Sequence, residues 1–166
     1  IYILPTREGL AALLTCAALT IGAINYQASL GLALAFLLAG AALVSMLHTQ
    51  RNLARLTVTV LDADPRFPGE RARFPVRVDN PGRRTRYGVA LVGEEGERQV
   101  FDADPGRTDA VAERSAVSRG VHPLGQLTVE THFPLRFFRA WAPILSGAEL
   151  VVYPRPGRRH PWPEVP

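Results

Sequence analysis

Two copies of one acidic tetrapeptide are the segments best suited to bind a metal ion. Residues 62–65 and 102–105 both read Asp-Ala-Asp-Pro, so each places two carboxylates two positions apart. A calcium loop draws roughly six to eight oxygen ligands, which is more than either segment supplies. Aspartate before proline is also common where a strand ends in a turn. We therefore expect turns at both segments and predict no metal site.

Other groups that could take part in acid-base chemistry are scattered. Glu94, Glu95 and Glu97 form an acidic run, which is most simply a solvated hairpin turn, because a catalytic carboxylate pair needs a pocket around it. His132 falls on the polar side of an alternating segment, and we expect it to be an exposed strand residue. The four histidines are far apart in the sequence: His48, His122, His132 and His160.

Several enzyme classes lose their usual residues here. All nineteen basic residues are arginine, which excludes a P-loop lysine and a lysine Schiff base. The single cysteine, Cys16, lies in an apolar segment, where burial suppresses the thiolate. We predict that the protein is not an enzyme and has no catalytic, cofactor-binding or metal-binding residue. A hydrolase with a dispersed site, in which His132 or acidic residues converge on a pocket, is the least favoured alternative.

The first third of the chain predicts a membrane anchor. No charged residue occurs between positions 10 and 50. Thr6 can cap a helix that begins there, and residues 7–24 would span about 27 Å of a hydrocarbon layer that is about 30 Å thick. A polar turn at 25–29 separates this segment from a second apolar span at 30–48. We predict a transmembrane helical hairpin over residues 1–52.

Small residues and arginines indicate how this hairpin packs and is oriented. Gly31, Ala35 and Ala39 recur every four residues, as do Ala18 and Gly22. Such stripes let helices approach closely in lipid, although an alanine-rich sequence also produces this spacing by chance. Basic residues flank the spans on one side only: Arg7, Arg51 and Arg55. The positive-inside rule then places both ends in the cytoplasm and the turn outside.

The remaining sequence predicts an all-β domain. Apolar and polar residues alternate at 57–60 and 74–79, as in a sheet with one wet face. Five further strands are expected at 87–92, 98–101, 110–117, 127–133 and 150–153. Short strands in this number favour an immunoglobulin-like antiparallel sandwich over residues 53–153. Residues 154–166 are rich in proline and arginine and read as a linker or tail.

The charged and aromatic residues indicate which kinds of partner the protein could bind. The net charge is +4 and the pI is near 10, yet the arginines are interleaved with acids, so we expect no nucleic-acid partner. Attraction of Arg51 and Arg55 to anionic lipid is a simpler use of the charge. The aromatic cluster at 133–141 is expected to pack in the core. The alternative is an exposed surface for a partner or for the bilayer interface.

Several segments together resemble a bacterial family of membrane proteins. They occur at residues 4–9, 25–27, 45–49, 51–53, 119–120, 133–141 and 152–154. In order and spacing they are similar to the N-terminal part of the domain-of-unknown-function 58 family, whose members are usually encoded beside MoxR-type AAA+ ATPases. The resemblance implies a two-helix anchor, a β-sandwich and a following von Willebrand factor A-like region. No segment matches the Asp-x-Ser-x-Ser metal motif of that region, so no functional residue is carried over.

Together these features lead to a hypothesis about function. We expect a multi-pass protein of the bacterial inner membrane whose β domain lies in the cytoplasm. The resemblance implies that it serves protein assembly with a MoxR-type ATPase, often near a transglutaminase-like membrane protein. The main alternative is an extracytoplasmic domain that binds an envelope polymer, which would reverse the topology. Whether the protein binds a small-molecule ligand is left open by the sequence.

Overall fold

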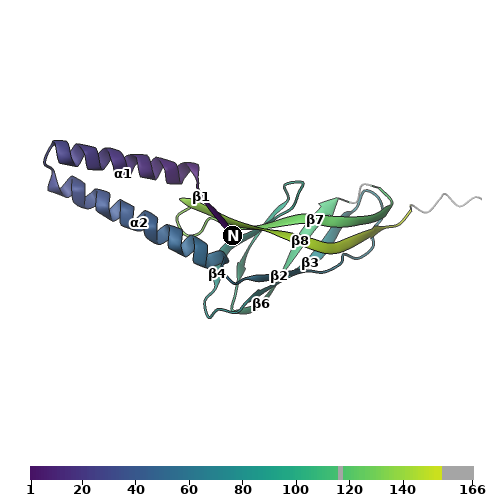
Figure 1. The fold of residues 1–166 in the computed structure, drawn as a ribbon. Coiled ribbons are helices and arrows are strands. Elements are labelled where there is room, and N and C mark those ends of the chain that lie inside the picture. The colour runs from purple at the N-terminus through teal and green to yellow at the C-terminus, as the bar shows by residue number, and fades with distance from the viewer. Residues whose placement is uncertain (116–117, 155–166) are drawn as a thin grey trace, which may run out of the picture.

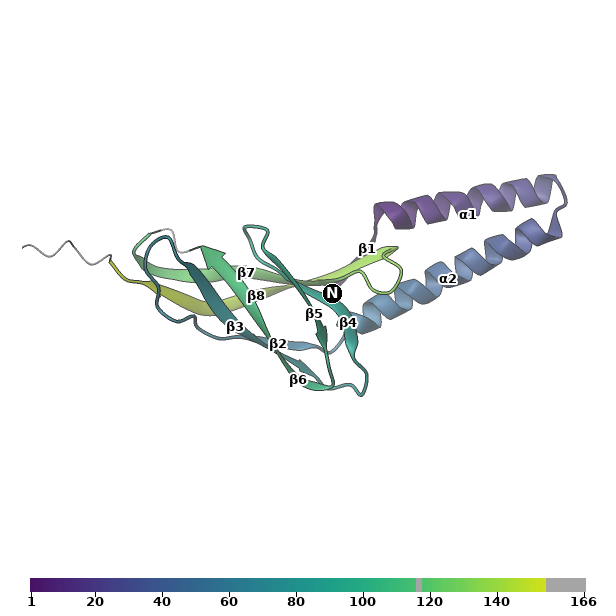
Figure 2. The same ribbon diagram turned by 180° about the vertical axis from the view of Figure 1, so that it is seen from behind.

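A helical hairpin projects from one end of a β domain (Figure 1). The structure, a computed structural model, describes residues 1–115 and 118–154. Helix α1 covers Arg7–Asn25 and helix α2 covers Ser29–Leu53. Both are long and apolar enough to cross a membrane. Seen from behind, the hairpin and the C-terminal end of β8 still lie at opposite ends of the molecule (Figure 2).

The helices begin close to the predicted positions, but α2 ends later. Thr6 caps α1 as expected, since its side-chain oxygen accepts a hydrogen bond from the Gly9 amide at 3.1 Å. The prediction placed the end of the second span at residue 48, whereas α2 continues to Leu53. The extra turn is helical because its residues Thr49, Asn52 and Leu53 are buried. Apolar composition alone does not show that this last turn packs against the β domain.

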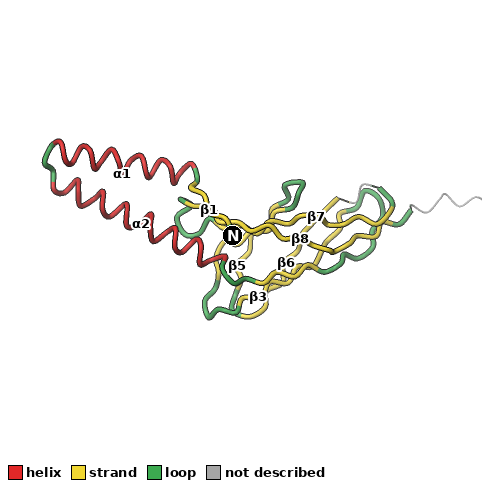
Figure 3. The backbone as a smooth tube through the Cα atoms, viewed as in Figure 1, coloured by secondary structure: helices red, strands yellow, loops and turns green. Residues whose placement is uncertain are grey.

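The strands form two antiparallel sheets, which occupy the chain after the helices apart from one N-terminal strand (Figure 3). The five-stranded sheet has the order β1 (Tyr2–Pro5), β8 (Phe138–Val152), β7 (Gly120–Thr131), β4 (Arg86–Val92), β5 (Arg98–Ala103). The three-stranded sheet has the order β2 (Thr57–Val60), β3 (Arg71–Asn80), β6 (Gly106–Ser115). The prediction of two apolar helices followed by antiparallel sheets is therefore confirmed.

Alternating residues from both sheets build one hydrophobic core. In β3, Phe74, Val76 and Val78 are almost fully buried, while Arg73 and Pro75, which alternate with them, are exposed. This is the pattern of period two that the sequence displays. Strands of the other sheet meet them with the buried side chains of Val89, Leu91, Leu127, Val129, Ala148 and Leu150. Leu53 at the end of α2 joins the same cluster.

The first and last strands differ from the prediction. Residues 2–5, assigned to the membrane hairpin, form β1 and pair with 138–141 of β8. Strand β8 begins at Phe138, twelve residues before the expected strand, because β7 pairs with it along its length. The aromatic cluster at 133–141 places only Ala140 in the core, and Phe133 and Leu135 are exposed. The predicted tail lies outside the described residues from position 155 onward.

The small residues of the hairpin were predicted only in part. Ala35 is buried against α1, and a side chain at Gly31 would come within 3.1 Å of the Ala23 methyl group. Ala18 and Ala39 are exposed instead. The two helices therefore approach each other most closely near their connecting turn, along Ala23, Gly31 and Ala35.

Candidate functional site

The start of α1 is fixed to the loop between β7 and β8, residues 132–137. The Thr6 amide donates a hydrogen bond to the Phe137 carbonyl at 2.9 Å, and the Thr6 hydroxyl donates to the Arg136 carbonyl at 2.5 Å. Gly9 is buried against the same loop, where a Cβ atom would lie 2.0 Å from the Phe137 oxygen. Only glycine permits this close approach of helix and loop.

The end of α2 is fixed to the same part of the β domain. The Thr49 hydroxyl donates to the Phe133 carbonyl at 2.8 Å. The Asn52 side-chain amide donates to the Tyr87 carbonyl at 2.7 Å and to the Thr131 hydroxyl at 2.9 Å. Because Thr49 and Asn52 are buried, these bonds satisfy polar groups that would otherwise be costly to remove from water. We call this set of contacts between the two helices and the β domain the joint.

The joint collects residues that are far apart in the sequence. Four of the segments that carry the family resemblance meet there, namely residues 4–9, 45–49, 51–53 and 133–141. The roles of Thr49 and Asn52 at the joint were not predicted from the sequence. The available signal was that both polar residues follow an apolar span at helical spacing, on one face of α2.

A basic hollow of about 450 Å³ lies beside the joint. The Nη1 atom of Arg86 donates to the Arg51 carbonyl at 2.6 Å, which ties the start of β4 to the end of α2. Tyr87 and Phe133 place their ring centroids 5.4 Å apart and form an aromatic wall. The residues around the hollow are His48, Arg51, Asn52, Arg84, Thr85, Arg86, Tyr87 and Phe133.

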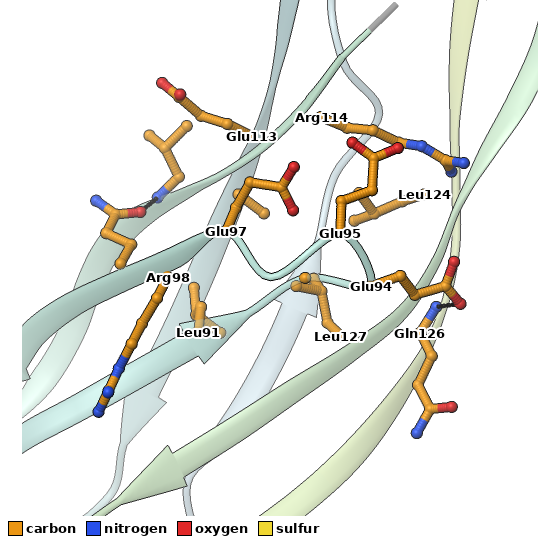
Figure 4. Close-up of a pocket in the computed structure, with 14 residues that line it drawn as sticks. Leu91, Glu94, Glu95, Glu97, Arg98, Glu113, Arg114, Leu124, Gln126 and Leu127 are labelled. Carbon is orange, nitrogen blue, oxygen red and sulfur yellow. Dashed lines mark hydrogen bonds between the residues drawn. The ribbon is translucent and has the colours of Figure 1, made fainter.

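An acidic hollow of about 290 Å³ lies between β5 and β6, at the edges of the two sheets (Figure 4). Its apolar surface comes from both sheets and includes Leu91, Leu127 and Val111. Its polar rim contains two arginines, Arg98 and Arg114, and a larger number of carboxylates, three from the β4–β5 turn and one from β6: Glu94, Glu95, Glu97 and Glu113. The predicted solvated turn is thus one wall of a pocket, which the sequence could not reveal.

The four carboxylates of the acidic hollow differ in how they are satisfied. Glu94 accepts a hydrogen bond from the Gln126 amide at 3.0 Å, and Glu113 pairs with Arg73 at 3.1 Å. Within the described ranges, Glu95 and Glu97 have neither a hydrogen bond nor an ion pair through their carboxylates. Both point to the same side of the turn, away from Gln126 (Figure 4). The hollow suits a cationic group carried on an apolar stem.

Carboxylates that were weighed as metal ligands instead accept hydrogen bonds within the β domain. Asp62 accepts a hydrogen bond from the Glu149 amide, and Asp102 accepts one from the Gly88 amide. Asp104 accepts from the Thr85 hydroxyl at 2.8 Å. Among residues 1–115 and 118–154, no three histidine, cysteine or acidic side chains gather as a metal site would require.

The histidines also remain apart. His48 borders the basic hollow, and His122 contacts the Ser118 carbonyl at 2.8 Å. The expectation of an exposed strand position for His132 is wrong, because it is half-buried just after β7. Its burial lowers the pKa of the imidazole, although nearby Glu130 opposes the shift. His160 lies outside the described residues.

Comparison with protein-family models and with curated proteins found no match for this chain. Its two hollows and the joint are therefore the features from which a function is inferred. The lining of the acidic hollow includes no histidine, serine or cysteine, and its charged groups are four carboxylates and two guanidinium groups.

Proposed function

We propose that this chain is a non-enzymatic, membrane-anchored interaction module that works with a MoxR-type AAA+ ATPase in protein assembly. The hairpin crosses the bacterial inner membrane, and the β domain, an immunoglobulin-like sandwich, is held at the cytoplasmic surface. The observation that carries the proposal is the joint, which holds the β domain directly at the ends of two apolar helices. The resemblance to the domain-of-unknown-function 58 family supports the choice of partner.

Exposed apolar side chains support the placement in a membrane. Leu14 is 72% exposed, Phe36 70% and Leu30 85%, and little of either span is covered by the protein. A continuous apolar surface of this kind is unfavourable in water. The 25 residues of α2 extend for about 37 Å, so its last turns emerge from a hydrocarbon layer of about 30 Å. The polar contacts of the joint are made by those last turns.

Two features support the sandwich and its use as a docking platform. One core cluster joins residues from both antiparallel sheets, as in an immunoglobulin-like architecture. The acidic hollow offers the free carboxylates of Glu95 and Glu97 above an apolar floor. We propose that a basic, partly apolar segment of the partner binds there. Charge complementarity would speed the encounter and select the partner.

Copurification tests this proposal with the full-length protein in mild detergent. We expect the MoxR-type ATPase to be recovered with the wild type and lost with the double variant Glu95→Gln and Glu97→Gln. Glu149→Gln is the matched control, because Glu149 is exposed on β8 and its carboxylate has no bonding partner among the described residues. Failure of the wild type to recover the ATPase would overturn the proposal. Equal recovery of the ATPase with the double variant would show that the acidic hollow is not the docking site.

Protease treatment of spheroplasts tests the orientation separately. The cytoplasmic placement predicts that the β domain is protected until the membrane is opened. Digestion from outside would instead support the alternative role in binding an envelope polymer.

A further inference from the structure

We propose that the basic hollow beside the joint binds the phosphate group of an anionic phospholipid. This inference rests on the membrane anchoring proposed above and adds a specific lipid site to it. The site comprises three arginines, the aromatic wall and the C-terminal turn of α2. Each of these features points to a lipid headgroup by a separate observation.

The first observation is the depth of the hollow relative to the membrane. His48 and Arg51 lie three residues apart on α2 and therefore on one face of the helix. His48 is the last residue of the predicted second span, and Arg51 is the first charged residue after it. In a bilayer this turn of α2 would lie at the level of the headgroups, where phosphate groups are concentrated.

The second observation is the charge that remains unpaired. Arg84 and Arg86 extend the positive surface from β4, and neither they nor Arg51 forms an ion pair with a carboxylate of the described chain. The Nε atom of Arg86 is buried and has no hydrogen-bond partner there. A phosphate oxygen would supply the acceptor that this guanidinium lacks, and arginine binds phosphate through paired N–H groups. The carboxylate of Asp104 nearby is bonded to Thr85.

The third observation is the aromatic wall. Tyr87 is 49% exposed and Phe133 37% exposed, although they contact each other. Aromatic side chains favour the boundary between headgroups and acyl chains. A free phosphate ion would leave this apolar side of the hollow uncovered, whereas a lipid places its glycerol and first methylene groups against it. The hollow thus fits a phospholipid better than a soluble anion.

Lipid titration of the full-length protein in mild detergent tests the inference. The readout is the midpoint of thermal unfolding as phosphatidylglycerol, phosphatidylcholine or inorganic phosphate is added. We expect saturable stabilisation by phosphatidylglycerol alone. Arg84→Gln should weaken the apparent affinity about fivefold, the effect of one arginine at an anionic surface. Arg119→Gln, which removes an exposed arginine distant from the joint, should not change it.

The proposed lipid site and the membrane anchoring on which it rests can fail separately in these experiments. Arg84 is exposed and its side chain makes no hydrogen bond, so Arg84→Gln without lipid should unfold at the wild-type temperature. Equal stabilisation by both lipids, or the same affinity in Arg84→Gln as in the wild type, would overturn the site. If inorganic phosphate stabilised the protein with the same half-saturating concentration as the lipid, the site would be assigned to a soluble anion instead. Membrane anchoring is measured independently by labelling within the spans, so each failure is distinguishable.

Discussion

Replacing Asn52 with alanine is expected to destabilise the joint between hairpin and β domain. The change removes hydrogen bonds of 2.7 Å to the Tyr87 carbonyl and 2.9 Å to the Thr131 hydroxyl. At about 1 kcal/mol for each bond, the free energy of unfolding should fall by about 2 kcal/mol. For a chain of this size that corresponds to a midpoint lowered by roughly 6 °C.

Thermal unfolding in mild detergent, followed by tryptophan fluorescence, measures this effect. Gln50→Ala is the matched control, since Gln50 is exposed on the same turn of α2 and its side chain makes no hydrogen bond. The control should shift the midpoint by less than about 1 °C. A double-mutant cycle with Thr131→Val should give a coupling energy of about 1 kcal/mol. Equal unfolding midpoints for Asn52→Ala and Gln50→Ala would refute the stabilising role assigned to Asn52 at the joint.

Two further changes probe the same region. Gly9→Ala should lower the free energy of unfolding by about 2 kcal/mol or more, because the new Cβ would collide with the Phe137 carbonyl. Gly22→Ala is the control, since a Cβ there has free space around it and should not lower the free energy of unfolding. The two variants are compared by their thermal unfolding midpoints. The pKa of His132 is lowered in the fold by burial, so the unfolded chain binds more protons and stability should fall as the pH drops below the ordinary value of 6.5. His132→Gln should flatten this dependence in unfolding experiments run from pH 7.5 to 5.5, and an unchanged slope would contradict it.

The elements that were predictable are those with a local signal. A charge-free stretch and the capping residue Thr6 specify the hairpin, because lipid tolerates an uncharged surface and a helix start needs acceptors for its free amides. The period of two in β3 specifies a strand with one buried face, and Phe74 and Val76 are buried as that pattern requires.

Features formed by distant segments were not predictable. Strand β1 is four residues long and pairs with residues near Phe138, so nothing local marks Tyr2–Pro5 as a strand. The joint depends on Thr49 and Asn52 meeting residues about eighty positions later in the chain, as their bonds to Phe133 and Thr131 show. The acidic hollow likewise forms only when the edges of two sheets come together. A sequence pattern reports which face is buried, but it does not report what lies against that face.

Cysteine labelling of the first span tests the central claim that the hairpin lies in lipid. In a Cys16→Ser background, Leu14→Cys and Tyr26→Cys are treated with a charged maleimide in proteoliposomes opened to the reagent. Both positions are highly exposed in the fold, at 72% and 82%, so protein packing cannot protect either one. We predict rapid labelling of position 26 and protection of position 14 until the protein is denatured. Equal labelling rates at the two positions would contradict the membrane anchor and the function built on it.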